Sequence, residues 1–416
     1  MKRTLFSTFL CFTLLANLSA QWTTGADIPE GIRAGNTISH IQNEKAYVYL
    51  FGGRNDEEII SLKSYRYNLS DDAWETMSDL PSETLGSSAA KIGDQIYVIG
   101  GGVPGAATNK VRKYSIPDNS WNEVANFPQI YGDGDAVAYQ DSLIYVVGSY
   151  NNEKTTVYNV NTNKWRAGTA VPSPGFALSY GALSVYGNKL IYVGGSNGTF
   201  SATYWNTVWI GEIDQNDRSQ ITWTQGTPFP GQTRTFFELQ PWANGLILIG
   251  GTTNNTFDTF TDENYFYDVD NDSWTELTPK PTAWNTGNAA SIFKDGVWKL
   301  VCTGGFAVEY LLKTEIYTQE NLATSDADDT DLCHLKYMRT IGGKNPKVSF
   351  CINVNGKVGM KIWDGQGRLV REKQSIAQNA GQHLISIEEI NLPTGIYMIT
   401  LSQNGFHQTK KVQILN

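Results

Sequence analysis

The chain is short of charged side chains, histidine and cysteine. Only 18% of its 416 residues are charged, it contains four His and four Cys, and its formal net charge is −9. A soluble domain usually carries about 25% charged residues. A net-negative chain with no basic run beyond its first residues does not have the electrostatics of a nucleic-acid or anionic-membrane binder. We therefore expect neither as a partner.

Long apolar runs are also missing, apart from one at the start. Lys2 and Arg3 precede an apolar stretch that extends to Leu18, and Ser19 and Ala20 then lead to Gln21. This is the pattern of a cleavable secretory signal, and the stretch is too short and too interrupted by polar residues for a good membrane span. We predict that residues 1–20 are a signal peptide, and that the exported chain has no membrane span after cleavage.

Cysteine is too scarce for a disulfide framework. Without Cys11 in the signal, the chain keeps Cys302, Cys333 and Cys351, an odd number that allows at most one disulfide. Cys302 lies in an apolar strand pattern, so Cys333 and Cys351 are the favoured pair, although export permits a disulfide without requiring one. No CxxC spacing is present, and we expect neither a metal nor a cofactor.

Glycine and aromatic residues are abundant, and they recur in a unit of about fifty residues. An apolar strand ends in glycine, a strand with Tyr follows, and an Asx-rich turn then leads to Trp. The glycine motifs end at Gly53, Gly102, Gly148, Gly195, Gly251 and Gly305, and the tryptophans are Trp22, Trp74, Trp121, Trp165, Trp223 and Trp274.

The first and last units are complementary. The sixth glycine motif has no Trp after it, and Trp22 has no glycine motif before it. Together they make one complete unit. A closed ring explains this, because the N-terminal strand then completes the last sheet and no sheet edge is left unpaired.

These units resemble kelch repeats, and six of them resemble the six-bladed kelch β-propeller over residues 21–320. Ser149 replaces the expected second glycine in the third unit, and the fourth unit is longer, with an additional Trp205. The resemblance implies a fold and leaves the function open, because one scaffold can carry unrelated sites.

After the repeats the composition changes. Residues 321–338 are rich in Ala, Ser, Thr and Asp, which is typical of a solvated acidic linker. A calcium loop is the alternative for these aspartates, but no glycine or late Glu completes one. Residues 339–416 contain short alternating strands without the glycine and Trp periodicity, and we predict a small immunoglobulin-like β-sandwich there. The fold class is therefore all-β throughout.

Three ordered motifs mark the C-terminal part. They are Ile362-Trp-Asp-Gly-Gln-Gly-Arg-Leu-Val370, Leu392-Pro-Thr-Gly-Ile-Tyr397 and Lys410-Lys-Val412. In this order they resemble the C-terminal sorting domain of proteins exported by the type IX (Por) secretion system of Bacteroidota. The resemblance implies that residues 339–416 engage the type IX machinery, and that the protein passes through the periplasm to the cell surface or the extracellular space. A generic adhesive immunoglobulin-like module is the alternative.

The longest loops are expected on one face of the ring, after the glycine motifs and before the innermost strands. Such loops on a rigid scaffold are suited to hold a ligand at the mouth of the central channel. The candidate ligand-binding residues there are Arg33, Tyr131, Asp133, Tyr204, Trp205, Arg234 and Trp284. For each, a structural role between blades is the alternative, and for Arg33 and Arg234 we favour that structural role. Asp133 and Asp135 are two residues apart and could serve in acid–base chemistry, but turn residues fit this glycine-rich segment better.

Catalysis finds little support in the sequence, and we assign no catalytic residue. Kelch-type copper oxidases need a His and Cys-Tyr centre, whereas residues 21–320 hold only His40 and Cys302. Kelch sialic-acid mutarotases use a Glu and an Arg, and the matching motif is not found around Arg234. We therefore expect a secreted or cell-surface propeller that binds a glycan or an extracellular protein. The alternatives are a carbohydrate-acting enzyme of the acyl-sugar mutarotase or isomerase type, which would use an Arg and a carboxylate at the channel mouth, and a purely structural surface component.

Overall fold

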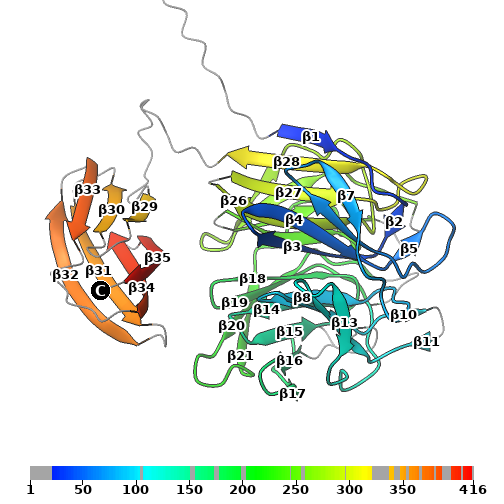
Figure 1. The fold of residues 1–416 in the computed structure, drawn as a ribbon, viewed down its shortest axis with the longest axis horizontal. Coiled ribbons are helices and arrows are strands. Elements are labelled where there is room, and N and C mark those ends of the chain that lie inside the picture. The colour runs from blue at the N-terminus through cyan, green and yellow to red at the C-terminus, as the bar shows by residue number, and fades with distance from the viewer. Residues whose placement is uncertain are drawn as a thin grey trace, which may run out of the picture. The chain divides into compact units, whose positions relative to one another are not determined.

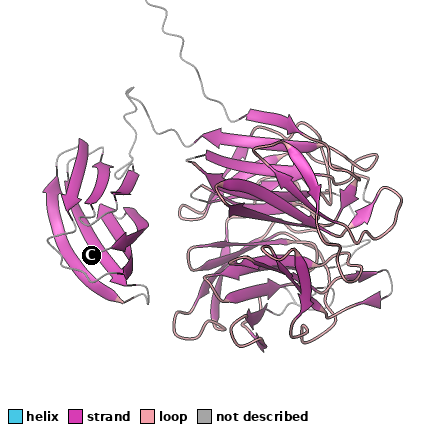
Figure 2. Cartoon of the chain, in the orientation of Figure 1, coloured by secondary structure: helices cyan, strands magenta, loops and turns pink. Residues whose placement is uncertain are grey.

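The computed structural model describes two compact units, within residues 1–323 and 324–416. The described residues are 21–103, 106–149, 155–172, 178–197, 203–243, 245–253, 258–295 and 297–320 in the first unit, and 337–341, 347–352, 356–364, 368–378, 381–386, 395–403 and 406–414 in the second. All of their regular elements are strands (Figures 1 and 2). Among these residues, no helix has the length and apolar character that a membrane crossing requires.

The first unit contains six four-stranded antiparallel sheets, which we call blades 1 to 6. From the innermost strand outward, blade 1 is β3 (Asn36–Gln42), β4 (Lys45–Phe51), β6 (Ser64–Asn68) and β7 (Ala73–Thr76); blade 2 is β8 (Ser88–Ile92), β9 (Gln95–Ile99), β12 (Val111–Ser115) and β13 (Ser120–Glu123); blade 3 is β14 (Asp135–Tyr139), β15 (Leu143–Val147), β16 (Thr155–Asn159) and β17 (Lys164–Ala167). Blade 4 is β18 (Ala182–Tyr186), β19 (Lys189–Val193), β20 (Val208–Ile213) and β21 (Ile221–Gly226); blade 5 is β22 (Glu238–Trp242), β23 (Gly245–Ile249), β24 (Asn264–Asp268) and β25 (Ser273–Leu277); blade 6 is β26 (Asn288–Lys294), β27 (Val297–Thr303), β28 (Thr314–Glu320) and β1 (Gln21–Gly25). Two short pairs join β2 (Ile32–Arg33) to β5 (Arg54–Asn55) and β10 (Gly102–Val103) to β11 (Ala106–Ala107).

The prediction of six blades closed by the N-terminal strand is confirmed. Strand β1 lies antiparallel to β28 as the outermost strand of blade 6, with Trp22 opposite Tyr317. In Figure 1 the blue β1 therefore lies beside the yellow β28. The innermost strands of neighbouring blades adjoin one another and enclose the central channel.

The periodic tryptophans hold each blade to the preceding one. Each indole N–H donates to the main-chain carbonyl four residues after the preceding Trp. The six bonds run from Trp74 to Ala26 (3.0 Å), Trp121 to Ser78 (3.0 Å), Trp165 to Ala125 (2.9 Å), Trp223 to Thr169 (3.1 Å), Trp274 to Thr227 (2.9 Å) and Trp22 to Thr278 (3.3 Å). The last bond closes the series, and each ring also buries apolar area between sheets.

The second unit consists of two antiparallel sheets. One contains β29 (Tyr337–Ile341), β30 (Lys347–Ile352) and β33 (Gly381–Ser386); the other has the order β32 (Leu369–Gln378), β31 (Gly356–Asp364), β34 (Gly395–Gln403) and β35 (Phe406–Ile414). The all-β prediction is thus confirmed for both units. The predicted signal peptide and almost all of the predicted linker lie outside the described residues, as does Cys333. Cys302 is a buried free thiol.

Candidate functional site

A pocket of about 1700 Å³ occupies the central channel. The innermost strands of blades 1 to 5 and the segments before the innermost strands of all six blades line it. Its mouth opens where the loops after the glycine motifs and the loops between blades meet, because the innermost strands begin there and the second strands end there. This is the face on which the sequence places the binding residues.

Six equivalent residues frame the mouth, and we call them the mouth collar: Ala34, Gly86, Asp133, Tyr180, Phe236 and Thr286. Each has a positive φ, between 46° and 66°, and each lines the pocket. Their backbones form a hydrogen-bonded series around the channel, in which the N–H of one residue donates to the carbonyl of its counterpart in the preceding blade. The bonds run from Ala34 to Thr286 (2.7 Å), Thr286 to Phe236 (3.1 Å), Phe236 to Tyr180 (3.2 Å), Tyr180 to Asp133 (2.8 Å) and Asp133 to Gly86 (2.8 Å).

The six collar residues share one backbone conformation, but their side chains differ from blade to blade. Left-handed backbone is unfavourable for residues other than glycine, and such residues gather at functional sites. Asp133, Tyr180 and Phe236 come from three consecutive blades, 3 to 5. The rings of Tyr180 and Phe236 lie 4.2 Å apart between centroids, and the Tyr180 hydroxyl donates to Asp133 Oδ2 at 3.1 Å. The other three blades contribute only Ala34, Gly86 and Thr286, which leave space across the mouth.

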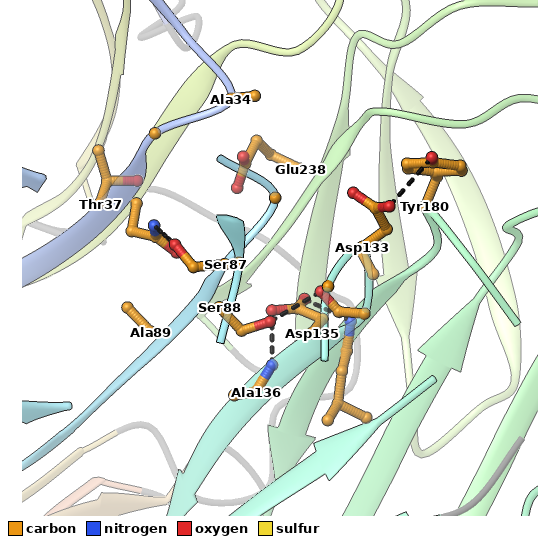
Figure 3. A pocket seen from close by; sticks show the side chains of 18 of the residues that line it. Ala34, Thr37, Ser87, Ser88, Ala89, Asp133, Asp135, Ala136, Tyr180 and Glu238 are labelled. Atoms are coloured by element: carbon orange, nitrogen blue, oxygen red, sulfur yellow. Dashed lines mark hydrogen bonds between the residues drawn. The ribbon is translucent and has the colours of Figure 1, made fainter. Parts of the chain in front are cut away.

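Two further carboxyl groups lie one step deeper, two residues after the collar. Asp135 begins β14 and accepts hydrogen bonds from the backbone N–H of Ala136 (2.7 Å) and of Leu183 in the next blade (2.8 Å). Glu238 begins β22 and accepts a hydrogen bond from the Gln240 side chain at 3.2 Å. Figure 3 shows Asp133, Asp135 and Glu238 around this one pocket.

All three carboxyl groups hold protons more tightly than usual. Burial raises the pKa of Asp133 to about 6, against the smaller opposing effect of the Tyr180 hydrogen bond. Burial likewise raises the pKa of Asp135 to about 6 despite its two backbone donors. Burial, followed by the charge of Asp135, raises the pKa of Glu238 well above its ordinary value. Carboxyl groups of this kind can both accept and donate hydrogen bonds near neutral pH.

The cationic side chains that line the pocket are already engaged. Arg33 donates from Nε to the Tyr310 hydroxyl at 2.9 Å and lies 3.7 Å from a Glu58 oxygen, while Arg54 pairs with the same Glu58 at 3.0 Å. Lys91 lies at the opposite end of the channel, next to His40. The described residues contain no group of three or more His, Cys, Asp or Glu suited to a metal ion.

Of the seven candidate residues, the structure brings Arg33 and Asp133 to the pocket lining. Tyr131, Arg234 and Trp284 are fully buried and occupy one repeat position, two residues before the collar. The rings of Tyr131 and Trp284 pack against the glycine motif of the preceding blade, whereas the Arg234 side chain lies against the glycine motif of blade 5, the blade that it leads into. An added Cβ at Gly100 would meet Tyr131 at 2.4 Å, and one at Gly250 would meet Trp284 at 2.0 Å.

Arg234 has a structural setting of the kind that the sequence analysis favoured for it. Its guanidinium pairs with Glu263 and donates to the Gly250 carbonyl at 3.3 Å. The two residues are far apart in the sequence, so no local motif announces the pair. Tyr204 is buried in a β-bridge to Ser196, and Trp205 packs against the core between blades 3 and 4.

Glu238, Tyr180 and Phe236 are pocket residues that sequence reasoning did not single out. Aligning the repeats on Asp133 would have placed Tyr180 and Phe236 at the same position, and Glu238 at the position of Asp135. The sequence analysis instead aligned the units on their glycine and Trp residues, and the loop before the innermost strand varies in length.

The comparisons agree with this architecture. Residues 48–313 match the Attractin/LZTR1 beta-propeller model, and residues 345–415 match the Secretion system C-terminal sorting domain. Kelch-like protein 23 of Mus musculus is 24% identical over 285 residues, which are 66% of this chain and 47% of that protein. An N-acetylneuraminate epimerase of Haemophilus influenzae is 30% identical over 186 residues, which are 44% of this chain and 46% of that enzyme.

The chain thus spans about half the length of these curated relatives. The solved structure of YjhT shares the fold, with a TM-score of 0.56 and 14% identity over 71% of this chain and 99% of that one. The C-terminal domain implies export through type IX secretion. The six closed blades and the family match over residues 48–313 show that this chain belongs to the Attractin/LZTR1 β-propeller family, with a secretion sorting domain at its C-terminal end.

Proposed function

We propose that the protein is a binding propeller of the cell surface or the extracellular space, and that its channel mouth holds a neutral, hydroxyl-rich ligand such as the end of a glycan. The observation that carries this proposal is the asymmetry of the mouth collar. At the collar and one step deeper, blades 3 to 5 present two aromatic rings and three carboxyl groups, while blades 6, 1 and 2 contribute only Thr286, Ala34 and Gly86 to the collar of this pocket of about 1700 Å³.

The chemistry of this wall fits sugar hydroxyls. Carboxylate oxygens accept hydrogen bonds from hydroxyl groups. Carboxyl groups with a pKa near 6, when protonated, can also donate a hydrogen bond to a sugar oxygen. The rings of Tyr180 and Phe236 offer apolar surface to the face of a sugar ring. Arg33 and Arg54 share Glu58 as their ion-pair partner, and three carboxyl groups face the same pocket, so we expect the mouth to favour neutral ligands over acidic ones.

A glycan array that contains neutral and acidic glycans, probed with the full chain, tests the proposal. We expect retention of neutral glycans, loss of that retention in Phe236→Ala, and no loss in Phe293→Ala. Phe293 is an exposed ring at the other end of its blade and serves as the matched control. No retention of any glycan, retention of acidic glycans alone, or equal behaviour of the two variants would contradict the proposal.

Two observations favour a second function, acid–base catalysis on a sugar. Asp133 and Asp135 have pKa values of about 6, which suits proton transfer near neutral pH, and a similar protein is an N-acetylneuraminate epimerase. Neither the Arg234–Glu263 pair nor the Arg54–Glu58 pair suits this function. Arg234 is buried outside the pocket. Hydrogen bonds from Arg54 and Tyr310 lower the pKa of Glu58, so this carboxylate is a weak base. NMR of sugar anomers distinguishes the two functions, since only an enzyme accelerates their interconversion.

A further inference from the structure

The far end of the channel holds a lysine in an unusual setting. Lys91 is three residues beyond Ser88, the counterpart of Asp135, so its Cα lies about 10 Å deeper along the innermost strands at 3.3 Å per residue. It lines the channel pocket. Its Nζ lies 3.2 Å from Nδ1 of His40, which is on the adjacent innermost strand β3.

Burial and neighbouring charges shift the pKa values of both His40 and Lys91. His40 is only 7% exposed, and burial followed by the charge of Lys91 lowers its pKa, so the imidazole is neutral and Nδ1 accepts from the amine. His40 Nε2 faces Asp94 at 3.6 Å. Burial lowers the pKa of Lys91, and the charge of Asp94 opposes this shift without cancelling it.

Lys45 and Lys63 of the same propeller differ from Lys91 in their hydrogen-bond partners and in the direction of their pKa shifts. Lys45 pairs with Asp71 at 2.8 Å and Lys63 pairs with Asp79 at 2.9 Å, and both lie on the outside. The hydrogen bonds that Lys45 and Lys63 donate to these carboxylates raise the pKa of both lysines. Lys91 instead has a neutral base as its hydrogen-bond partner and a cavity in front of it.

We infer that Lys91 is a carbonyl-reactive amine at the base of the channel, which captures a small aldehyde, such as an open-chain sugar, as a reversible imine with His40 as the proton carrier. This inference does not depend on glycan binding at the mouth collar.

The chemistry balances with the residues present. Lys91 first gives one proton to His40 Nδ1, and the lone pair of Nζ attacks the carbonyl carbon, which yields a neutral carbinolamine after a proton moves from nitrogen to oxygen. His40 then returns its proton to the hydroxyl group, the C–O bond breaks, and water leaves. A protonated C=N bond remains, and addition of water reverses every step.

Reductive trapping on the full chain tests this inference. The protein is incubated at pH 7 with glyceraldehyde and sodium cyanoborohydride, and the modified lysines are mapped by peptide mass spectrometry. Each unit by which a lysine pKa falls increases the neutral amine about tenfold. Because burial lowers the pKa of Lys91 while carboxylates raise those of Lys45 and Lys63, we expect Lys91 to be modified several-fold faster than either of them. Modification of Lys91 at the same rate as these two lysines, or slower, would overturn the inference.

The role of His40 is tested separately. In His40→Gln we expect the rate at Lys91 to fall several-fold while the rates at Lys45 and Lys63 stay unchanged. An unchanged rate at Lys91 would refute the proton-carrier role. If this variant does not fold, the comparison of lysines within the native protein still decides whether Lys91 is reactive.

Discussion

Trp22 lies opposite Tyr317 across the β1–β28 pair, with ring centroids 5.1 Å apart. The two residues are separated by almost the whole propeller, so this contact joins the beginning and the end of the ring. The indole N–H of Trp22 also donates to the Thr278 carbonyl at 3.3 Å. The other five periodic tryptophans each donate to the equivalent carbonyl of the blade before their own. The closed channel, and therefore the position of the mouth collar, depends on this junction.

Truncation of Trp22 should open the junction. Trp22→Ala removes a half-buried ring and its hydrogen bond, and we expect a loss of about 2–3 kcal/mol in the free energy of unfolding. Trp22→Phe keeps the ring and should recover more than half of that loss. Urea unfolding followed by fluorescence measures both, because eleven of the twelve tryptophans lie in the propeller. A Trp22→Ala variant as stable as the native chain would show that β1 does not close the ring.

The glycine motif can be tested with two substitutions of the same kind. Gly250 has φ of 71°, and an added Cβ would lie 2.0 Å from the Trp284 ring nitrogen. Gly93 has φ of 57° and open space around it. Gly93→Ala should cost about 1 kcal/mol from backbone strain alone. Gly250→Ala adds overpacking and should cost about 3 kcal/mol or more. Equal losses of unfolding free energy would contradict the packing role of this position.

The ion pair of the buried Arg234 with Glu263 can be tested for a contribution to the stability of the fold. In Glu263→Gln the guanidinium keeps its charge in the interior without its carboxylate, and we expect a loss of about 1–3 kcal/mol, moderated because Glu263 is itself 38% exposed. Glu276→Gln, on the exposed neighbouring strand β25, is the matched control and should be neutral. Thermal unfolding measures both, and a neutral Glu263→Gln would indicate that the pair does not stabilise the propeller.

Stability should depend on pH through the mouth carboxyls. Asp133 and Asp135 have a pKa of about 6 in the folded protein, above the ordinary value of 3.8. The folded state thus binds more protons than the unfolded state between about pH 4 and 6, so the free energy of unfolding falls as pH rises through this range. The fall is on the order of 1–3 kcal/mol for each group.

Asp133→Asn should reduce this pH dependence and stabilise the propeller at pH 7.5 relative to the native chain. At pH 4 its advantage should vanish, because Asp133 is then protonated. Urea unfolding at the two pH values checks this. A native chain whose stability rises between pH 4 and 6, and a variant that keeps the same slope, would contradict the raised pKa.

The sequence was sufficient to predict the closed six-bladed ring, but not the residues that line the mouth of its channel. The six tryptophans and the glycine motifs recur with enough regularity to predict both the number of blades and the strand exchange at Trp22. Tyr131, Arg234 and Trp284 look different in the sequence, yet they occupy one repeat position, from which the two rings reach the glycine motif of the preceding blade and Arg234 reaches that of its own blade. The glycine and Trp motifs did not align Asp133 with Tyr180 and Phe236, because the loops before the innermost strands differ in length. The backbone hydrogen bonds of the mouth collar show this equivalence, and Glu238 lines the pocket two residues after Phe236.

Calorimetric titration of the best glycan from the array into the full chain tests the binding proposal most directly. Glu238→Gln removes an ionisable acceptor from the pocket wall, whereas Glu212→Gln makes the same change at an exposed position of β20 in blade 4. We predict that Glu238→Gln weakens binding about tenfold or more, and that Glu212→Gln leaves the affinity unchanged. Unchanged affinity in Glu238→Gln, or equal loss in both variants, would contradict ligand binding at the channel mouth.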